Sequence, residues 1–350
     1  MRIRDFIKRS QYLVYYFKKM DWPKYKKYFR YARKQTGRGF IGLFCENIRC
    51  MYKYNIGVID YFLFRFFEKD AAERARWVGT GYKYEYDLIM NPKSTRDVLE
   101  NKIKFYEAYE SFVLHAVCTI QDIKEGTEKA RIIMENSSGK IVVKDSLGQC
   151  GWDVEIINCA DHDTESLYKY MKSKGFDLAE EFIIQHPDIN RLSDSGVNTV
   201  RIISQLNKDN EVEILGARMR ISVNAWVDNL ASGNIASPVD LETGRLNGLG
   251  IYSDITKERV TKHPVSGIEL VGYQIPLWEE SLDLVKRAAL HRPENRAIGW
   301  DVVLTEKGPE LLEGNHNWCK ILWQIPIDTG LKHVLVKHLQ ELPPELRKRQ

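Results

Sequence analysis

The sequence has few cysteines and no long apolar run, and each absence excludes a class of protein. Its six cysteines are scattered and none forms a Cys-x-x-Cys pair, which is typical of a reducing interior without a structural zinc site. No apolar stretch reaches the roughly 18 residues that a membrane-spanning helix needs. No small-residue cleavage site follows an apolar segment at the N-terminus. We therefore expect a cytoplasmic protein.

Motifs for nucleophilic catalysis and for nucleic-acid binding are lacking as well. The sequence has no Gly-x-Ser-x-Gly turn and no Cys/His arrangement in a recognisable context. It also has no known nucleic-acid motif, and its N-terminal aromatic residues follow helical spacing. We therefore expect no serine or cysteine nucleophile and no nucleic-acid partner.

The charge of the chain is small in total but unevenly distributed. Residues 1–34 contain twelve Lys or Arg against Asp5 and Asp21, a net charge of +10, so that the remainder of the +4 chain carries −6. Such a segment is either a face that binds a membrane surface or another polyanion, or a solvated helix face packed on the body of the protein. Both interpretations stay open at this point.

Residues 1–95 read as helical and aromatic. Asp21 is suited to an N-cap, Pro23 to a first turn and Gly37 to a C-terminal stop. Between them, apolar residues recur at i, i+3, i+4 and i+7: Tyr25, Tyr28, Phe29 and Ala32. We expect this stripe to be buried and the basic residues between its members to stay in water.

A polar cluster is predicted on a hairpin near the end of the chain. Residues 298–304 and 311–315 read as strands, joined by a turn that contains Gly308 and Pro309. Because side chains alternate between the faces of a strand, Glu313 and Asn315 share a face and can meet Asp301. Two carboxylates and an amide suit Mg²⁺ held jointly with substrate phosphates. The alternative is a polar rim on a half-exposed sheet.

Two basic features upstream could bind phosphate. Lys144 ends a predicted strand, residues 139–144, and a turn with two glycines follows it. An ammonium group and backbone N–H groups there could surround a phosphate, although a hairpin turn with a surface lysine has the same pattern. Residues 195–203 and 212–221 read as an antiparallel hairpin that carries Arg201, Arg218 and Arg220. These arginines are either a phosphate clamp or ordinary cross-strand charges.

Asp228 and Asn229 follow the second strand closely and are further site candidates.

The order of these features resembles the ATP-grasp superfamily, and most closely its sugar-transfer-associated branch. The resemblance covers roughly residues 55–325. It is carried by Gln-His-Pro at 185–187, Val-Asn-Thr-Val-Arg at 197–201, Asp-Asn at 228–229, His-Pro-Val-Ser-Gly at 263–267, Ile-Gly-Trp-Asp at 298–301 and Glu-Gly-Asn at 313–315.

The resemblance implies an α+β, ATP-grasp fold in which two α+β lobes clasp a nucleotide, preceded by the mainly helical, basic N-terminal region. The expected boundaries are 1–95 for the N-terminal region, 96–177 for the small lobe with its phosphate-binding loop, 178–328 for the large lobe with the metal site, and 329–350 for a C-terminal helix and basic tail. One departure is the N-terminal region, because a βα domain precedes many ATP-grasp folds.

The resemblance also implies roles for individual residues. The cofactor-binding set is expected to comprise phosphate-binding lysines and their loop, and a hinge that meets adenine: Lys102, Lys144, Ser146, Gly148 and Gly151, then Glu180, Glu181 and Ile183. The catalytic set is expected to comprise the anion clamp and an acceptor-side pair: Arg201, Arg218, Arg220, Asp228 and Asn229. The expected metal ligands are Asp301, Glu313 and Asn315. The phosphate loop has fewer glycines than is usual in the family.

The function implied is an ATP- and Mg²⁺-dependent carboxylate–amine ligase that acts through an acyl-phosphate. It would join an amino acid or similar unit to a sugar in surface polysaccharide or related biosynthesis, with a carboxylate donor and a small-molecule or glycan acceptor as partners. A phosphotransferase on the same scaffold and a non-catalytic nucleotide-binding partner protein remain alternatives, the latter disfavoured by the joint presence of Lys144, Asp301, Glu313 and Asn315. Peripheral association with the inner membrane surface through residues 1–34 also stays open.

Overall fold

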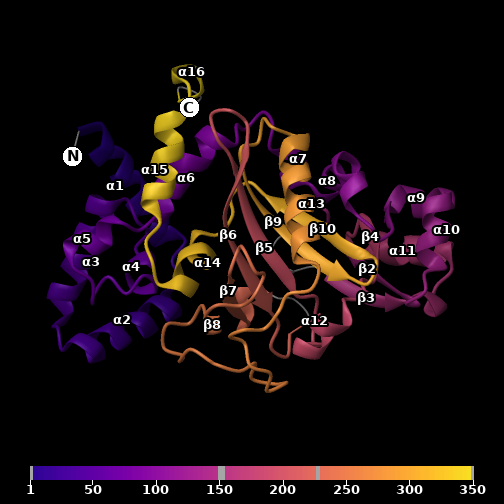
Figure 1. Cartoon of the computed structure of the whole chain (residues 1–350), viewed down its shortest axis with the longest axis horizontal. Coiled ribbons are helices and arrows are strands. Elements are labelled where there is room, and N and C mark those ends of the chain that lie inside the picture. The colour runs from indigo at the N-terminus through magenta and orange to yellow at the C-terminus, as the bar shows by residue number, and fades with distance from the viewer. Residues whose placement is uncertain (1–2, 149–153, 226–228, 348–350) are drawn as a thin grey trace.

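Helices and two antiparallel sheets form the chain, as the α+β expectation requires. The computed structural model describes residues 3–148, 154–225 and 229–347. Figure 1 shows the N-terminal helices at one end of the molecule, the larger sheet in the middle and the smaller sheet at the other end. Gly151 and Asp228, two of the expected site residues, lie outside the described residues.

The N-terminal region is helical, as predicted. Its helices are α1 (Ile3–Lys18), α2 (Trp22–Thr36), α3 (Phe40–Tyr54), α4 (Asp60–Leu63), α5 (Ala71–Ala75) and α6 (Thr80–Met90). In α2 the Asp21 side chain accepts a hydrogen bond from the Lys24 amide at 3.0 Å, and Gly37 ends the helix with a φ of 67°. The buried residues of α2 are the four of the predicted stripe, and they join a core rich in phenylalanine and tyrosine.

The small sheet has the strand order β1-β4-β2-β3. Its strands are β1 (Val117–Thr119), β4 (Leu178–Glu181), β2 (Lys140–Lys144) and β3 (Val154–Asn158). Its core includes residues from α9 (Ile120–Glu125), α10 (Glu128–Met134) and α11 (Thr164–Lys174). Because β4 pairs with both β1 and β2, the expected lobe boundary between residues 177 and 178 falls inside this structural unit.

The large sheet has the strand order β10-β9-β5-β6-β7-β8. Its strands are β10 (Gly308–Asn315), β9 (Ala297–Thr305), β5 (Thr199–Leu206), β6 (Val212–Ile221), β7 (Ile235–Val239) and β8 (Ile251–Tyr252). The two predicted hairpins, β5–β6 and β9–β10, are both present and pair with each other through β5 and β9.

Helices pack against both faces of the large sheet. One core contains residues of α8 (Lys102–Ala108), α12 (Pro187–Leu192) and α13 (Trp278–His291), and residues of α7 (Asp97–Glu100) pack against it. The opposite core joins α6 to α14 (Lys320–Gln324) and α15 (Lys332–Glu341), and α16 (Pro344–Arg347) follows. The predicted C-terminal helix therefore packs on the large sheet.

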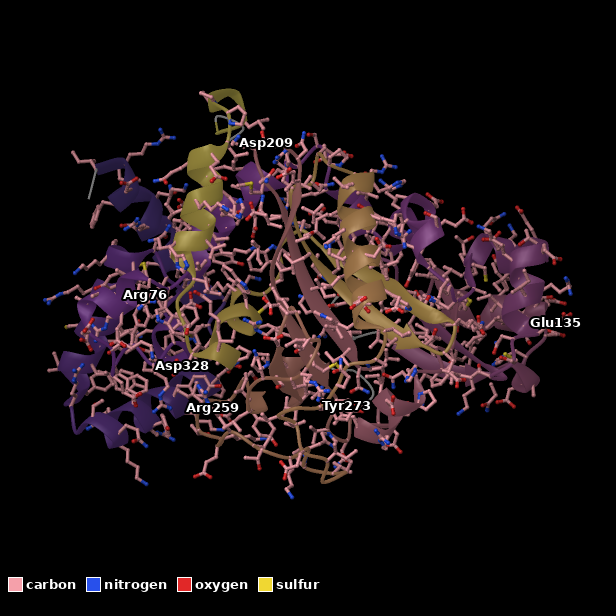
Figure 2. All side chains as sticks on the ribbon, viewed as in Figure 1. Arg76, Glu135, Asp209, Arg259, Tyr273 and Asp328 are labelled. Atoms are coloured by element: carbon pink, nitrogen blue, oxygen red, sulfur yellow. The ribbon has the colours of Figure 1, made fainter. Side chains whose placement is uncertain are left out.

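Polar contacts join the N-terminal region to the large lobe. Asp60 accepts a hydrogen bond from the Thr80 hydroxyl at 2.7 Å and pairs with Lys320 of α14 at 3.2 Å. Asp328 lies 3.4 Å from Lys69 and 3.6 Å from Arg259, and Figure 2 shows Asp328 and Arg259 near this junction. The helical region is thus packed on the large lobe.

Gly299 in β9 provides a test of the packing beside the polar hairpin. A β-carbon at this position would lie 2.5 Å from Cβ of Trp318 and 3.1 Å from Cδ of Arg201. We expect Gly299→Ala to lower the free energy of unfolding by about 1–3 kcal/mol, because the close-packed neighbours must shift. Urea denaturation measures the effect.

Gly42→Ala is the matched control, since Gly42 lies within a helix and has no atom within 4 Å of an added β-carbon. Its free energy of unfolding is expected to stay the same or rise by up to about 1 kcal/mol. Equal unfolding curves for the two variants would contradict the close contact of Gly299 with Trp318.

Candidate active site

A cleft of about 1160 Å³ is lined by residues of both sheets. The expected site residues that line it are Lys102, Lys144, Gly148, Glu180, Glu181, Ile183, Arg220, Asn229, Asp301 and Glu313. Residues from strands far apart in the sequence therefore meet in one cavity, at the position where the resemblance implies a nucleotide.

Opposite charges are densely packed at the large-lobe end of the cleft. Asp301 and Glu313 are paired directly across β9 and β10, after an irregularity in the register beyond Leu311. Arg201 donates two hydrogen bonds to Asp301, one of them at 2.7 Å, and Arg220 donates a third at 2.7 Å. Asp301 is 2% exposed, so its negative charge is compensated almost entirely by these two guanidinium groups.

The two carboxyl groups of this cluster differ in acidity. Burial works against ionisation of Asp301, but the charges of Arg201 and Arg220 outweigh it and hold the pKa of this carboxyl far below its usual range. Desolvation in the cleft and the negative charge of Asp301 raise the pKa of Glu313 above its ordinary value. A cation beside Glu313 would oppose both causes of that rise.

The donor set on this hairpin fits a hard cation such as Mg²⁺. Asn315 donates from its amide nitrogen to Glu313 Oε1 at 3.0 Å, which places its side chain beside the carboxylate as predicted. No group of three or more His, Cys, Asp or Glu side chains suited to a metal occurs in the described part of the chain. Two carboxylates and an amide would therefore need oxygens from phosphate and water, which is the usual arrangement for Mg²⁺.

Two lysines face the cleft from the small-lobe end. The Lys144 ammonium lies 2.5 Å from Glu180 Oε1, and the side chains of both residues are at most 10% exposed. Lys102 donates from its ammonium to the carbonyl oxygen of Gly148. Burial and the nearby charge of Lys144 lower the pKa of Lys102. An anion between the two lysines would relieve their mutual repulsion.

Ser146 supports the glycine turn rather than lining the cleft. Its backbone amide and its hydroxyl each donate to the Asp177 carboxylate at 2.7 Å, and its carbonyl accepts from the Lys102 amide at 3.0 Å. The hydroxyl is thus used within the protein, and the expectation that Ser146 contacts the cofactor is corrected to a structural role in the loop. No pattern in the sequence predicts that Asp177 binds Ser146.

The wall of the cleft along β4 is mixed in character. Glu181 accepts a hydrogen bond from the Ala116 amide at 3.1 Å, so its carboxylate is engaged with the small lobe. Apolar side chains adjoin it: Val142, Ile156, Phe182, Ile183 and Ile184. This apolar wall, beside the backbone of β4, is suited to a flat aromatic group such as adenine.

Arg218 does not belong to the cleft, although alternation puts it on the same strand face as Arg220. Its guanidinium donates to the carbonyl oxygens of Trp323 and Ala217. Burial lowers the pKa of Arg218 to about 10. The expected third member of the anion clamp is therefore wrong, because α14 covers this part of the sheet face.

Several motif residues form a hydrogen-bonded network behind the cleft. Asn198 donates to the carbonyl oxygen of Ser193 at 2.8 Å and accepts from the Ser222 amide at 2.7 Å. Gln185 accepts from the Asn198 amide at 2.6 Å, and His263 contacts the Ser222 carbonyl oxygen at 2.9 Å. The motifs at 185–187, 197–201 and 263–267 thus meet, and they hold the backbone that leads to Arg201.

Asn229 is also held from behind the cleft. Its carbonyl oxygen accepts from the Asn234 amide at 3.0 Å, and the Asn234 oxygen accepts from the Val223 amide at 2.7 Å. Asn234 therefore positions the loop that carries Asn229.

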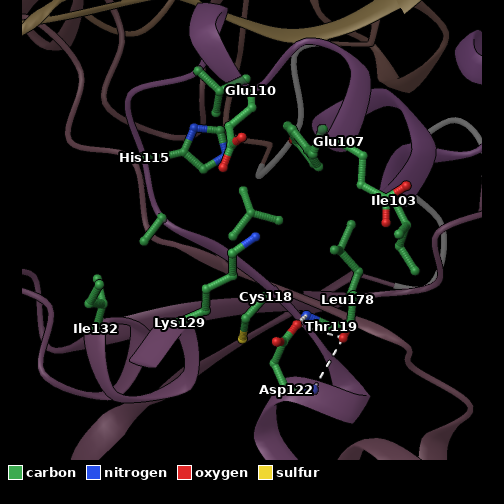
Figure 3. Close-up of a pocket in the computed structure, with 14 residues that line it drawn as sticks. Ile103, Glu107, Glu110, His115, Cys118, Thr119, Asp122, Lys129, Ile132 and Leu178 are labelled. Atoms are coloured by element: carbon green, nitrogen blue, oxygen red, sulfur yellow. Dashed lines mark hydrogen bonds between the residues drawn. The ribbon is translucent and has the colours of Figure 1, made fainter. Parts of the chain in front are cut away.

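A second cavity of about 610 Å³ contains none of the expected site residues and lies beside β1 (Figure 3). His115 lines it and contacts Glu310 Oε2 through Nδ1 at 2.7 Å. The Leu114 amide donates to the same oxygen at 2.6 Å, so Glu310 of β10 anchors the segment that enters the small sheet. Figure 3 also shows the Lys129 side chain extending towards the cavity.

No helix in the described part of the chain combines the length and apolar character needed to cross a membrane.

Comparison with known proteins identifies the family. The family described as sugar-transfer associated ATP-grasp matches residues 82–340, which is most of the chain. Comparison with curated proteins gave no match.

Solved structures that resemble the chain include ATP-grasp enzymes. The biotin carboxylase domain of a 2-oxoglutarate carboxylase from Hydrogenobacter thermophilus, in complex with MgADP, ADP and bicarbonate, is 16% identical with a TM-score of 0.41, covering 71% of this chain and 52% of that one. An L-amino acid ligase from Bacillus licheniformis is 14% identical with a TM-score of 0.36, covering 76% and 53%. An N5-carboxyaminoimidazole ribonucleotide synthetase from Thermotoga maritima is 12% identical with a TM-score of 0.42, covering 71% and 51%.

This chain spans about half the length of these solved structures. Likeness at this level carries no information about substrates. The family match over residues 82–340 agrees with the order of motifs and with the two sheets around the cleft. The chain belongs to the sugar-transfer associated ATP-grasp family.

Proposed function

We propose that the chain is an ATP- and Mg²⁺-dependent carboxylate–amine ligase. The observation that carries the proposal is a single cleft with Lys102 and Lys144 at one end and the Asp301–Glu313 pair, with Arg220, at the other. Basic side chains that bind phosphate and oxygen donors that bind Mg²⁺ are the two parts that phosphoryl transfer requires. Family membership supports ATP as the nucleotide.

The proposed reaction has two steps. A carboxylate oxygen of the donor attacks the γ-phosphorus of ATP, and ADP leaves, which gives an acyl-phosphate. A neutral amine then attacks the carbonyl carbon, inorganic phosphate leaves, and the nitrogen loses a proton to solvent. Mg²⁺ would neutralise charge on the phosphate oxygens, held by Asp301, Glu313 and Asn315.

The protein's own residues would supply position and charge for these steps. Lys102 and Lys144 would bind phosphate oxygens, and Arg220 would face the transferred group while Arg201 keeps Asp301 ionised. Glu180 and Glu181 of β4, and Ile183 after it, would meet adenine. The absence of a nucleophile motif in the sequence is consistent with this scheme, because neither step needs a covalent enzyme intermediate.

The acceptor is proposed to be an amine on a sugar of a surface polysaccharide or a related precursor. The family description supports transfer to a sugar, and Asn229, the expected acceptor-side residue that the structure describes, lines the same cleft as Arg220. The basic segment 1–34 would bring the enzyme to an anionic surface at the inner face of the membrane, where such precursors are presented.

Product analysis tests the reaction class. The chain is incubated with Mg²⁺–ATP and a panel of carboxylates, amines and amino sugars, with and without hydroxylamine. We expect ADP and free phosphate only when a carboxylate is present, and a hydroxamate when hydroxylamine replaces the amine. Phosphate retained in an organic product would instead indicate a phosphotransferase, and nucleotide binding without any turnover would indicate a non-catalytic partner protein.

Nucleotide binding is also expected to stabilise the fold. At nucleotide concentrations about 100 times the dissociation constant, the free energy of unfolding should rise by about 2.7 kcal/mol. The measurement is the melting temperature with Mg²⁺–ATP, with Mg²⁺ alone and with ATP plus a chelator. No shift with Mg²⁺–ATP in a folded sample would contradict the nucleotide assignment.

A further inference from the structure

The first helix presents an apolar stripe to solvent. Ile3, Ile7 and Val14 are 80%, 53% and 55% exposed, and no residue of α1 is buried. Their spacing of four and seven residues puts them on one side of the helix. A surface helix ordinarily turns its apolar residues towards the core. In α1, Leu13 and Tyr16 do so, and Ile3, Ile7 and Val14 form a second apolar side that faces solvent.

The inner side of α1 is held by apolar and polar contacts: Leu13 and Tyr16 pack against the N-terminal core, and ion pairs and hydrogen bonds lie beside them. Lys8 lies 3.3 Å from Glu85 of α6, and the Tyr12 hydroxyl donates to the same carboxylate oxygen at 3.4 Å. Arg9 donates to the carbonyl oxygen of Tyr52 in α3. The helix is therefore fixed in an orientation that leaves the apolar stripe outside, and Figure 1 shows it at the edge of the molecule.

Aromatic residues flank the stripe. Phe6, Tyr15 and Trp22 are 50%, 57% and 45% exposed. Phe6 stacks on Tyr52 with ring centroids 5.2 Å apart, and Trp22 stacks on Phe17 at 5.9 Å. Tyrosine and tryptophan are the residues enriched where protein meets the headgroup level of a bilayer, so their exposure here suits a lipid surface better than water.

Cations complete the pattern. Arg4 and Lys18 share the outer side of α1 with the stripe, and Lys19 follows directly. Within the described residues none of these three forms an ion pair, and the same holds for Lys26, Arg30, Arg33 and Lys34 in the next helix. Seven exposed cations of residues 3–34 are therefore without an acidic partner in the part of the chain that the structure describes.

We propose that α1 lies in the headgroup region of an anionic membrane, with Ile3, Ile7 and Val14 inserted and with Arg4, Lys18 and Lys19 at the phosphates. An amphipathic helix with cations beside its apolar side binds in this way. A second copy of this chain fits less well, because two segments of +10 would repel each other. The proposal is independent of the ligase chemistry, since no residue of α1 lines the cleft.

Sedimentation with vesicles tests the proposal. The full chain is mixed with vesicles of phosphatidylcholine alone or with added phosphatidylglycerol, at low and high salt. We expect binding only to the anionic vesicles, and weaker binding in high salt because screening shortens the reach of the charges to about 8 Å at physiological ionic strength. No binding to anionic vesicles at low salt would overturn the proposal.

Variants separate insertion from simple charge attraction. Ile3→Gln, Ile7→Gln and Val14→Gln together are expected to lower the partition coefficient at least about tenfold, because apolar surface no longer enters the lipid. The matched control replaces three comparably exposed apolar residues of the large lobe with Gln: Val265, Val271 and Leu290, which are 55%, 53% and 51% exposed. The control should bind like the wild type.

A third variant, with Arg4, Lys18 and Lys19 all replaced by Gln, should also bind more weakly. Loss of binding in this variant but not in the stripe variant would overturn insertion. Sedimentation without lipid gives the other decisive result: a wild-type dimer that the stripe variant abolishes would show that a second copy occupies the stripe. The Mg²⁺–ATP melting shift in every variant reports separately on the proposed function.

Discussion

Glu313→Gln is expected to lower turnover by at least about 10²-fold, the scale seen when one preorganised electrostatic group is removed from an active site. Glu313 lies opposite Asp301 in the β9–β10 hairpin, and its side chain is 39% exposed in the cleft. The substitution keeps the shape of the side chain and its contact with Asn315, but it removes a negative charge from the proposed metal ligands.

We expect no loss of folding stability from this change. The negative charge of Asp301 is one cause of the raised pKa of Glu313, so a neutral side chain relieves repulsion between the two groups. We therefore expect the melting temperature of the free protein to stay the same or rise. Steady-state kinetics and thermal unfolding of the same preparation measure the two effects.

Glu306→Gln is the matched control, because Glu306 is exposed in the turn between the same two strands. It should turn over ATP like the wild type. If Glu313→Gln kept wild-type turnover, the hairpin would be only the polar rim of a sheet. If both variants lost turnover, the loss could not be assigned to the cleft.

Local patterns in the sequence were sufficient to predict the elements that carry the site. Period-two alternation predicted the β9–β10 hairpin, and the structure pairs Glu313 with Asp301 across it. The expected position of the turn is wrong, because the turn lies at residues 306–307, and Gly308 and Pro309 belong to β10. Helical spacing predicted the buried stripe of α2. These predictions succeed because the contacts involved are between residues close in sequence or directly opposite in a hairpin.

Long-range packing decided the cases that local patterns could not. Alternation puts Arg218 and Arg220 on one strand face, but α14 covers the part with Arg218 and leaves the part with Arg220 in the cleft. Ser146 follows Lys144 in a turn, and yet Asp177, distant in sequence, binds its hydroxyl. Each outcome depends on which distant segment packs against a short polar motif.

The outward apolar stripe of α1 is another feature that local sequence patterns do not predict. Residues 1–95 were predicted to be helical, but that prediction does not say which side of α1 meets the protein. Packing of Leu13 and Tyr16 against the N-terminal core accompanies the polar contacts of Lys8, Arg9 and Tyr12 with α3 and α6 on that side. A sequence pattern that would ordinarily be assigned to a core is therefore left on the surface.

Asp301→Asn is expected to lower the free energy of unfolding by about 3–5 kcal/mol, the range for removal of one partner from a buried ion pair. Asp301 is 2% exposed and accepts hydrogen bonds from both Arg201 and Arg220. Asparagine keeps the size of the side chain but removes the negative charge that both guanidinium groups contact. Urea denaturation at neutral pH measures the loss.

The pH dependence of this loss has a definite sign. The two arginines hold the pKa of Asp301 in the folded chain below its ordinary value of 3.8. The stabilisation from the ionised carboxylate is therefore complete well above pH 3.8 and is lost as the pH falls below it towards the depressed value. The difference between wild type and variant should be largest at neutral pH and should shrink in acid.

Inorganic phosphate offers a second measurement on the same variant. With Asp301 neutral, the cleft has one negative charge fewer beside Arg201 and Arg220, and a phosphate ion can take the place of the missing carboxylate. Phosphate should therefore raise the melting temperature of Asp301→Asn more than that of the wild type. Asp283→Asn is the control, because Asp283 forms an exposed ion pair with Arg287 at 2.8 Å, and such pairs contribute at most about 1 kcal/mol. Unfolding of Asp301→Asn at the wild-type urea concentration would mean that the arginines do not depend on Asp301, and that the charge balance inferred for this end of the cleft is wrong.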